Sequence, residues 1–380
     1  MTAPPATISL MVLGSGDSEG KPRIVDLFAG PGGLDVGAAW LGIPSEGIEL
    51  DDNACATRDA AGLETRQGDV REFGPEDFPD ATVLTGGPPC QTFTVAGSGS
   101  GRRALDDVVT LVDRMANGED AADSLSVFED ERTSLVLEPM RWILEALRQD
   151  SPYEAIVLEQ VPQVLPVWAA YHKVLERFGY GVDHGIVRTE EFGVPQTRRR
   201  AVLIARLDDE ELTIPAPTHH AFRRGQPQQS TRKLEPWVSM ADALDRTVPF
   251  TVISNYGSGG DPRKRGRRQS DEPAATVTGK IMRNRLELAN NDFGRFTLQE
   301  AGRLQTFPRD YPWAGADIAQ QIGNAIPPRL SVHVLAAALN LLIDLEELDR
   351  SVCAPWESSR EGGVVIPITD PSAELLELVN

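Results

Sequence analysis

The chain has few cysteines, no long apolar run and no excess of positive charge. Its 3 cysteines are too few, and odd in number, for the disulfide framework of a secreted protein. No apolar run reaches membrane-spanning length, and residues 1–22 lack the basic start of a signal peptide. Clustered Cys and His residues, which would indicate a metal site, are also missing. We therefore expect a soluble, cytoplasmic protein without a metal, in which residues 1–22 form a disordered leader.

The charge is acidic overall but unevenly distributed. The chain has 37 basic and 57 acidic residues, a net charge of -20, which taken alone argues against a nucleic-acid partner. Residues 106–131 hold nine acids and one base, whereas 223–233 have four bases and no acid, and 261–268 have five bases and one acid. Salt screens charges beyond roughly 8–10 Å, so a polyanion would respond to such local stretches. Charge alone leaves open whether they bind a polyanion or are solvated loops.

Strand and helix patterns alternate along the first half of the chain. Apolar strand-like runs such as "RIVDLFAG", "ATVLT" and "YEAIVLEQV" are separated by helical patterns. This order is typical of an α/β fold with a doubly wound, mostly parallel sheet. From about residue 206 the periodicity weakens and Pro, Gly, Arg and Ser become common. We expect a catalytic domain at 23–205 plus 310–350, a smaller irregular domain at 206–309, and an acidic tail at 351–380.

Three successive strand ends carry features of a nucleoside-binding site. "DLFAGPGG" is a strand followed by a glycine turn at Gly30 and Gly32, where a ligand can approach bare backbone. Glu49 ends the next strand, nineteen residues after Gly30, and can accept hydrogen bonds from ribose hydroxyls. Asp69 follows a third strand and could read an adenine amino group. The alternative is a structural turn with two surface acids, and the repetition at successive strand ends favours the ligand.

A cysteine stands after a stiff turn in "GGPPCQTF". Pro88 and Pro89 fix the backbone before Cys90, which follows the carboxyl end of a strand, where α/β sheets bind ligands. The glycine-rich stretch after it is typical of a mobile lid. A packed structural cysteine needs neither feature, so the pattern favours a nucleophile. Cys55 and Cys353 are better explained as structural or incidental.

Two further segments bring an acid and two guanidinium groups to the same region. Glu159 ends the apolar strand in "VLEQV", where a carboxyl group could hold or donate a proton. In "QTRRR", Arg198 and Arg200 are two residues apart and share a face of a strand. Two guanidinium groups beside an acid could orient a base and a phosphate. The alternative is a solvated basic edge, which the following core strand "AVLIA" disfavours.

The order of these motifs resembles that of the DNA (cytosine-5)-methyltransferases. The matching segments, from about residue 23 to 345, are "DLFAGPGG", "GGPPCQTF", the strand with Glu159, "QTRRR", "RFTLQEAGRLQTFP" and "QIGNAIPP". Two departures are visible. Gln160 stands where the family usually has Asn, and the acidic block 106–131 looks like an insertion.

The resemblance implies a class I S-adenosylmethionine-dependent methyltransferase, with a target-recognition domain at 206–309. In such an enzyme the Cys90 thiolate would add to carbon 6 of a flipped-out cytosine. Glu159 would protonate or hydrogen-bond N3, and Arg200, supported by Arg198, would hold the base. S-adenosylmethionine would supply the methyl group for carbon 5. The cofactor residues that the resemblance implies are Phe28, Gly30, Gly32, Glu49, Asp69, Pro88 and Asn324.

The resemblance also implies a partner, which is double-stranded DNA bound by a monomer. A cognate restriction endonuclease would be a functional partner. Two alternatives stay open: an RNA (tRNA) cytosine-5 methyltransferase, and a catalytically silent DNA-binding relative marked by Gln160. The DNA-contacting residues that we expect are Arg102, Arg103, Arg263, Lys264 and Arg265.

Overall fold

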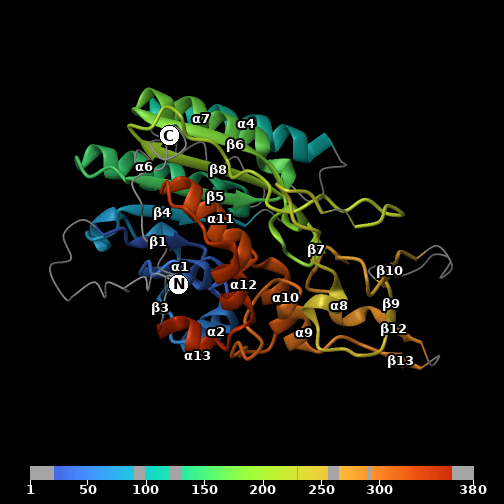
Figure 1. The fold of residues 1–380 in the computed structure, drawn as a ribbon. Coiled ribbons are helices and arrows are strands. Elements are labelled where there is room, and N and C mark those ends of the chain that lie inside the picture. The colour runs from blue at the N-terminus through green and yellow to red at the C-terminus, as the bar shows by residue number, and fades with distance from the viewer. Residues whose placement is uncertain are drawn as a thin grey trace, which may run out of the picture.

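A seven-stranded sheet forms the centre of the protein, in the order β3-β2-β1-β4-β5-β8-β6 (Figure 1). The computed structural model describes residues 21–89, 99–119, 131–228, 230–255, 265–289 and 292–361. The strands of this sheet are β1 (Ile24–Leu27), β2 (Ser45–Glu49), β3 (Glu64–Gln67), β4 (Val83–Gly86), β5 (Ala155–Gln160), β6 (Tyr180–Arg188) and β8 (Arg199–Leu207).

Most of this sheet is parallel. Strands β1 to β5 run in one direction, and β8 is antiparallel to both of its neighbours. β1 and β4 are buried along their whole length, which explains their nearly continuous apolar sequences. The carboxyl ends of the five parallel strands therefore meet at one edge, together with the start of β8. The predicted doubly wound, mostly parallel α/β fold is confirmed.

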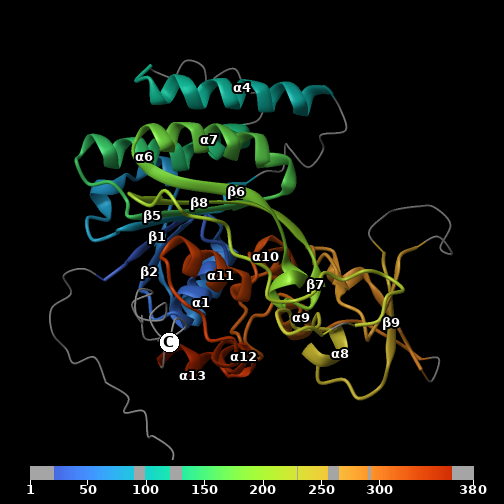
Figure 2. The same ribbon diagram turned by 45° about the horizontal axis from the view of Figure 1, so that its top comes forward.

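Helices cover both faces of the sheet. α1 (Gly33–Trp40) and α11 (Pro328–Ala338) pack on one face, and α6 (Glu138–Arg148) and α7 (Leu165–Arg177) pack on the other. α4 (Gly99–Ala116) lies over α7 and α6 as an additional layer, as Figure 2 shows. The short 3-10 turns are η1 (Val70–Glu72), η2 (Pro75–Asp77), η3 (Glu131–Leu137), η4 (Pro162–Val164), η5 (Thr189–Phe192) and η7 (Ile281–Arg283).

A second, four-stranded antiparallel sheet lies beside the first, in the order β10-β9-β12-β13. It has its own apolar core, to which α10 contributes Ile322, so this core includes residues beyond 309. The short strands β7 and β11 pair in parallel and join the two parts. The elements are β7 (Gln196–Thr197), α8 (Met240–Ala243), β9 (Phe250–Ile253), β10 (Arg267–Gln269), β11 (Ala274–Ala275), β12 (Arg285–Leu288), β13 (Phe293–Gly294), α9 (Leu298–Arg303) and α10 (Ile318–Asn324).

Residues 345–361 pack onto the part of the chain that carries the main sheet. It forms α12 (Leu345–Cys353) and α13 (Trp356–Glu361). Trp356 is 1% exposed, and its indole N–H donates to the carbonyl of Ala61, the last residue of α2 (Asp52–Ala61), at 3.0 Å. The tail expected at 351–380 therefore begins inside α12, and most of its residues up to 361 belong to α12 and α13. Residues 1–20, 120–130 of the acidic insertion, and 362–380 lie outside the described residues.

Candidate active site

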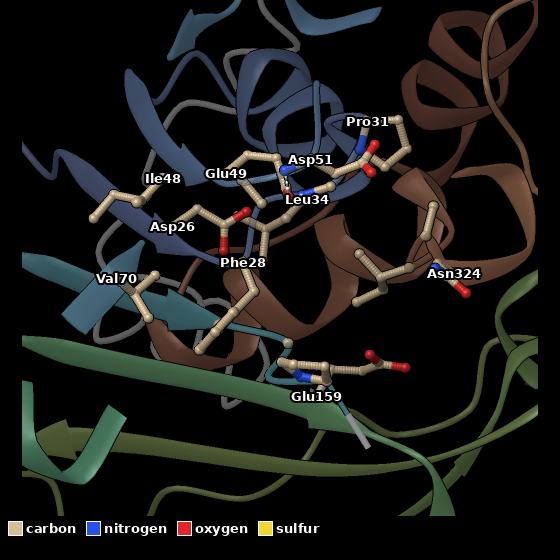
Figure 3. A pocket seen from close by; sticks show the side chains of 18 of the residues that line it. Asp26, Phe28, Pro31, Leu34, Ile48, Glu49, Asp51, Val70, Glu159 and Asn324 are labelled. Carbon is tan, nitrogen blue, oxygen red and sulfur yellow. Dashed lines mark hydrogen bonds between the residues drawn. The ribbon is translucent and has the colours of Figure 1, made fainter. Parts of the chain in front are cut away.

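A cavity of about 800 Å³ opens at the carboxyl ends of β1, β2, β4 and β5 (Figure 3). Its wall combines segments from both ends of the chain, since residues 323–326 close it beside the glycine turn. Two of the predicted cofactor residues, Gly32 and Pro88, do not line it, and Pro89 does. The predicted residues that line it are Phe28, Gly30, Glu49, Asp69, Glu159, Arg198, Arg200 and Asn324.

The glycine turn adopts backbone conformations that its sequence explains. Gly30 and Gly32 have positive φ values of 57° and 98°, which glycine adopts without strain, whereas Phe28 adopts φ 62° despite its side chain. A Cβ atom on Gly32 would lie 2.3 Å from Leu63 Cδ1 and 2.9 Å from the Tyr311 hydroxyl oxygen. Gly32 therefore permits close packing behind the turn, while Gly30 faces the cavity. A direct cofactor contact by Gly32 stays a prediction.

Glu49 is fixed by backbone donors. Its Oε2 accepts from the Gly30 N–H at 2.7 Å, and its Oε1 accepts from the N–H groups of Leu50 and Asp51 at 2.9 and 2.8 Å. A carboxylate has about four acceptor positions, so these three bonds orient the group and leave capacity for a ligand hydroxyl. Figure 3 shows Glu49 and Asp51 on the side of the cavity opposite Glu159.

Asp69 lies at the neighbouring strand end and is held by Arg71. The shortest contact joins Arg71 Nη2 and Asp69 Oδ2 at 2.6 Å, and Asp69 Oδ1 also accepts the Arg71 backbone N–H. The hydrogen bonds from the Arg71 side chain lower the pKa of Asp69 and keep it ionised. Both residues line the cavity. Asp69 can thus accept a hydrogen bond from a ligand amino group.

Asp26, which sequence reasoning missed, also lines the cavity from inside β1. Its side chain is 3% exposed, and Thr85 Oγ1 donates to its Oδ1 at 2.7 Å. Burial, followed by the nearby charge of Asp35, raises the pKa of Asp26 to about 8. The neighbouring Arg58 is paired with Asp35 at 2.7 Å, with both side chains 0% exposed. The sequence signal for Asp26 was an acidic residue within an otherwise apolar strand.

Glu159 and Arg200 form an ion pair on the other side of the cavity. Arg200 Nε lies 2.5 Å from Glu159 Oε1. Glu159 is near the end of β5, and the register partner of Glu159 on β8 is Val202, two residues after Arg200. The antiparallel pairing therefore brings the two predicted groups together. A guanidinium beside a carboxyl group fixes the orientation of that carboxyl toward the cavity.

Arg198 is buried and links three chain segments. Its Nη1 donates to the carbonyls of Val277 and Gly323 at 3.0 and 2.9 Å, and its Nη2 donates to that of Ala325 at 3.2 Å. It therefore holds the second sheet's region and the end of α10 against the start of β8. This position fits the supporting role expected of Arg198 more closely than contact with a base.

The Pro-Pro segment enters the cavity wall and is anchored by Gln160. Gln160 Nε2 donates to the Pro88 carbonyl at 2.5 Å, and Gln160 Oε1 accepts from the Val161 N–H at 2.5 Å. The amide that departs from the family pattern thus still reaches the segment before the predicted nucleophile. Cys90 itself lies outside the described residues, and Pro89, which precedes it, lines the cavity.

The remaining predicted residues are less fully placed. Asn324 ends α10 at the cavity rim, and its Oδ1 accepts from Gln320 Nε2 at 2.8 Å. Arg265 is exposed. Arg263 and Lys264 lie outside the described residues, as do the side chains of Arg102 and Arg103 in α4.

Two features are absent from the residues that the structure describes. No group of three or more His, Cys, Asp or Glu side chains there could hold a metal ion. In the same ranges, no helix combines the length and the apolar character needed to cross a membrane.

Known proteins resemble this chain over most of its length. The family model described as C-5 cytosine-specific DNA methylase matches residues 22–117, 121–243 and 225–340. The chain is 27% identical to the Type II methyltransferase M1.HphI of Haemophilus parahaemolyticus, over 83% of this chain and 86% of that protein. It is 28% identical to the Type II methyltransferase M.AplI of Arthrospira platensis, over 83% and 85%.

Solved structures agree on the fold. The S. pombe Dnmt2 methyltransferase has a TM-score of 0.59 at 18% identity, covering 84% of this chain and 99% of that one. The Entamoeba histolytica methyltransferase EhMeth has a TM-score of 0.55 at 15% identity, covering 85% and 99%. The predicted family is confirmed: the chain belongs to the C-5 cytosine-specific DNA methylases and is a DNA cytosine-5-methyltransferase.

Proposed function

We propose that the cavity binds S-adenosylmethionine together with one cytosine drawn out of double-stranded DNA. The observation that carries the proposal is the two-sided lining of a single cavity. Glu49 and Asp69 line one side, the Glu159–Arg200 pair lines the other, and Pro89 forms part of the wall. Its volume of about 800 Å³ falls within the range of roughly 300–1,000 Å³ that is usual for ligand pockets.

The side with Glu49 suits the cofactor. The fixed Glu49 carboxylate would accept from the ribose hydroxyls, Asp69 would accept from the adenine amino group, and Ile48 and Val70 provide apolar walls. S-adenosylmethionine supplies an electrophilic methyl group when it is bound. The residues that we propose to hold it are Phe28, Gly30, Glu49, Asp69 and Asn324, with Gly32 and Pro88 shaping the backbone around them.

The other side suits the base. Carbon 5 of cytosine is a weak nucleophile, and addition of the Cys90 thiolate to carbon 6 moves an electron pair toward carbon 5. Glu159, oriented by Arg200, would donate a proton or hydrogen bond to N3 during this addition. After methyl transfer, the carbon-5 proton is lost and the ring double bond re-forms. The bond between carbon 6 and sulfur breaks at the same time, and Cys90 leaves as the thiolate.

The duplex would be held by basic residues outside the cavity lining. Extruding a base costs a few kcal/mol, which contacts to the phosphates can offset. We propose these contacts for Arg102, Arg103, Arg263, Lys264 and Arg265. Reversing the charges of the last three should weaken DNA binding in a salt-dependent way, and a flat salt titration would count against this placement.

The departure at Gln160 supports an active enzyme over a catalytically silent relative. Because the Gln160 amide still bonds the Pro88 carbonyl, the segment before Cys90 keeps an anchor. The curated relatives are named Type II methyltransferases, so we propose a cytoplasmic, monomeric modification enzyme with a cognate restriction endonuclease. That endonuclease should fail to cut DNA treated with this protein.

The test is nucleoside mass spectrometry on duplex DNA incubated with the protein and S-adenosylmethionine. We expect 5-methylcytosine from the parent and none from Cys90→Ala. The matched control is Cys353→Ala, an exposed cysteine at the end of α12, which should retain activity. Equal activity of Cys90→Ala and the parent would overturn the covalent mechanism, and methylation of tRNA in place of DNA would favour the RNA alternative.

A further inference from the structure

A buried glutamine, Gln305, holds the part of the cavity wall that residues 323–326 form. Its side chain is 0% exposed and lies just after α9. Its Nε2 donates to the carbonyls of Ile322 and Ala325 at 2.6 and 3.2 Å. These two carbonyls flank the segment that brings Asn324 to the cavity (Figure 3). One side-chain amide therefore fixes the backbone on both sides of Asn324.

A second buried glutamine, Gln196, determines which way the Gln305 amide points. Gln196 Nε2 donates to Gln305 Oε1 at 2.5 Å and to the Leu304 carbonyl at 2.9 Å. Gln196 Oε1 accepts from the Val277 N–H at 3.0 Å. Because each amide oxygen faces an N–H group and each amide nitrogen faces an oxygen, turning either amide over would lose hydrogen bonds. The network therefore has a single arrangement, and Gln305 presents its donors to the wall.

The turn that carries Gln305 has an unusual backbone conformation. The next residue, Thr306, has a φ of 66°, which is rare for a β-branched residue. The Thr306 hydroxyl donates to the Gln305 carbonyl at 2.5 Å and accepts from the Arg329 N–H, in the first turn of α11, at 3.1 Å. Strained residues persist where the surroundings fix them, and they cluster at functional sites. The position of Gln305 is thus fixed from its backbone as well as from its side chain.

The wall that Gln305 holds is packed against backbone on two sides. A Cβ atom on Gly33, beside the glycine turn, would lie 2.2 Å from the Ile326 carbonyl oxygen. A Cβ atom on Gly323 would lie 2.3 Å from the backbone nitrogen of Gly279. Backbone in such close contact cannot adjust by rotating a side chain. A displacement of this wall would therefore change the shape of the cavity beside the glycine turn.

We propose that Gln305 is a positioning residue that sets the affinity of the cavity for S-adenosylmethionine through the wall that carries Asn324. The inference rests on the proposed function, in which this side of the cavity holds the cofactor. Gln305 does not line the cavity, and it acts by keeping the wall ordered before the cofactor binds. The Glu159–Arg200 pair is held instead by the pairing of β5 with β8. Loss of the Gln305 amide should therefore weaken cofactor binding more than the chemical step.

The experiment compares the parent with Gln305→Leu, in which a side chain of similar size leaves the two carbonyls without their donor. Calorimetry gives the Kd of S-adenosylhomocysteine, and methylation of duplex DNA gives KM and kcat for S-adenosylmethionine. We expect Kd and KM to rise about 10- to 100-fold while kcat stays within about 3-fold. A parent that binds no S-adenosylhomocysteine would contradict the proposed function. A parent that binds it no more tightly than folded Gln305→Leu overturns this inference alone.

Three further variants separate positioning from a general loss of stability. Val252→Ala, in the core of the second sheet, should lower Tm and leave Kd and KM at the parent values. Gln228→Leu removes another amide-to-carbonyl hydrogen bond, to Trp237, and should also leave them unchanged. If Gln305→Leu does not fold, Gln305→Asn keeps the amide on a side chain too short to reach both carbonyls, and should give a smaller rise in Kd. A parental Kd in a folded Gln305 variant, a fall in kcat with KM unchanged, or an equal rise in Kd in Val252→Ala overturns the proposal.

Discussion

Replacing Asp26 by Asn should stabilise the ligand-free protein, although Asp26 lines the active-site cavity. The folded protein raises the pKa of Asp26 from 3.8 to about 8, mainly by burial. A carboxyl group with a raised pKa binds its proton more tightly when folded, so stability falls as pH rises from 3.8 towards 8. Asn has the same shape, does not ionise, and can still accept from Thr85.

The size of the effect follows from the pKa difference. A pH of 7 is about 3 units above the pKa of Asp26 in the unfolded chain and still below its pKa of about 8 in the folded protein. Each of these units corresponds to about 1.4 kcal/mol of unfolding free energy. The free energy of unfolding of Asp26→Asn should therefore exceed that of the parent by up to about 4 kcal/mol at pH 7, with little difference near pH 4. The gain should shrink steadily as the pH is lowered between these limits.

Urea unfolding of the parent and Asp26→Asn at several pH values between 4 and 8 measures this difference directly. Asp80→Asn, which changes an exposed acid in the same domain, is the control and should follow the parent curve. A constant difference between Asp26→Asn and the parent across this range would refute the reasoning. A confirmed difference would mean that the carboxyl group is retained against stability, as expected of a group that serves ligand binding in this cavity.

Three other outcomes follow from the structure. Glu159→Gln should lower kcat about 10²–10⁴-fold in single-turnover methylation while DNA affinity stays within a few-fold, since the amide cannot donate a proton as an acid does. Burial and nearby Arg329 lower the pKa of His219 to about 4 and of His333 to about 3. Through each of these histidines the protein should therefore lose about 2 kcal/mol of unfolding free energy as the pH falls from 6.5 to 5. In urea unfolding, the stability of His333→Leu should depend less on pH than that of the parent. Trp356→Ala should cost about 3–5 kcal/mol in thermal or urea unfolding, because the buried indole fills the space beside Ala61.

The strand-end acids could be found from the sequence because the fold places them by rule. In a parallel sheet the carboxyl ends share one edge, so Glu49, Asp69 and Glu159 had to lie near one another once their strands were recognised. The pairing of Glu159 with Arg200 needed one more fact, the antiparallel register of β5 and β8. Periodicity carries no information on register between strands that are forty residues apart.

Other features depend on contacts that no local pattern contains. The spacing of Gly30 and Gly32 predicts a turn, but only the packing of Leu63 and Tyr311 shows that Gly32 faces away from the cavity. Asp26 lies inside an apolar strand, where alternation alone does not tell which side opens onto a ligand. The acidic composition after residue 350 predicts a solvated tail, yet one tryptophan there contacts a carbonyl 295 residues earlier.

The distribution of charge along the cavity orders the two ligands. The side with Glu49 and Asp69 is acidic and would suit the proposed methyl donor, which carries positive charge, whereas the opposite side presents the Glu159–Arg200 pair. Because like charges repel across a site with little water, DNA phosphates are disfavoured on the acidic side and the cationic donor on the basic side. Under the proposed function, each ligand would therefore bind on the side of the cavity whose charge complements its own. The net charge of -20 opposes DNA binding in general, so we expect the proposed DNA substrate to approach where basic residues are concentrated.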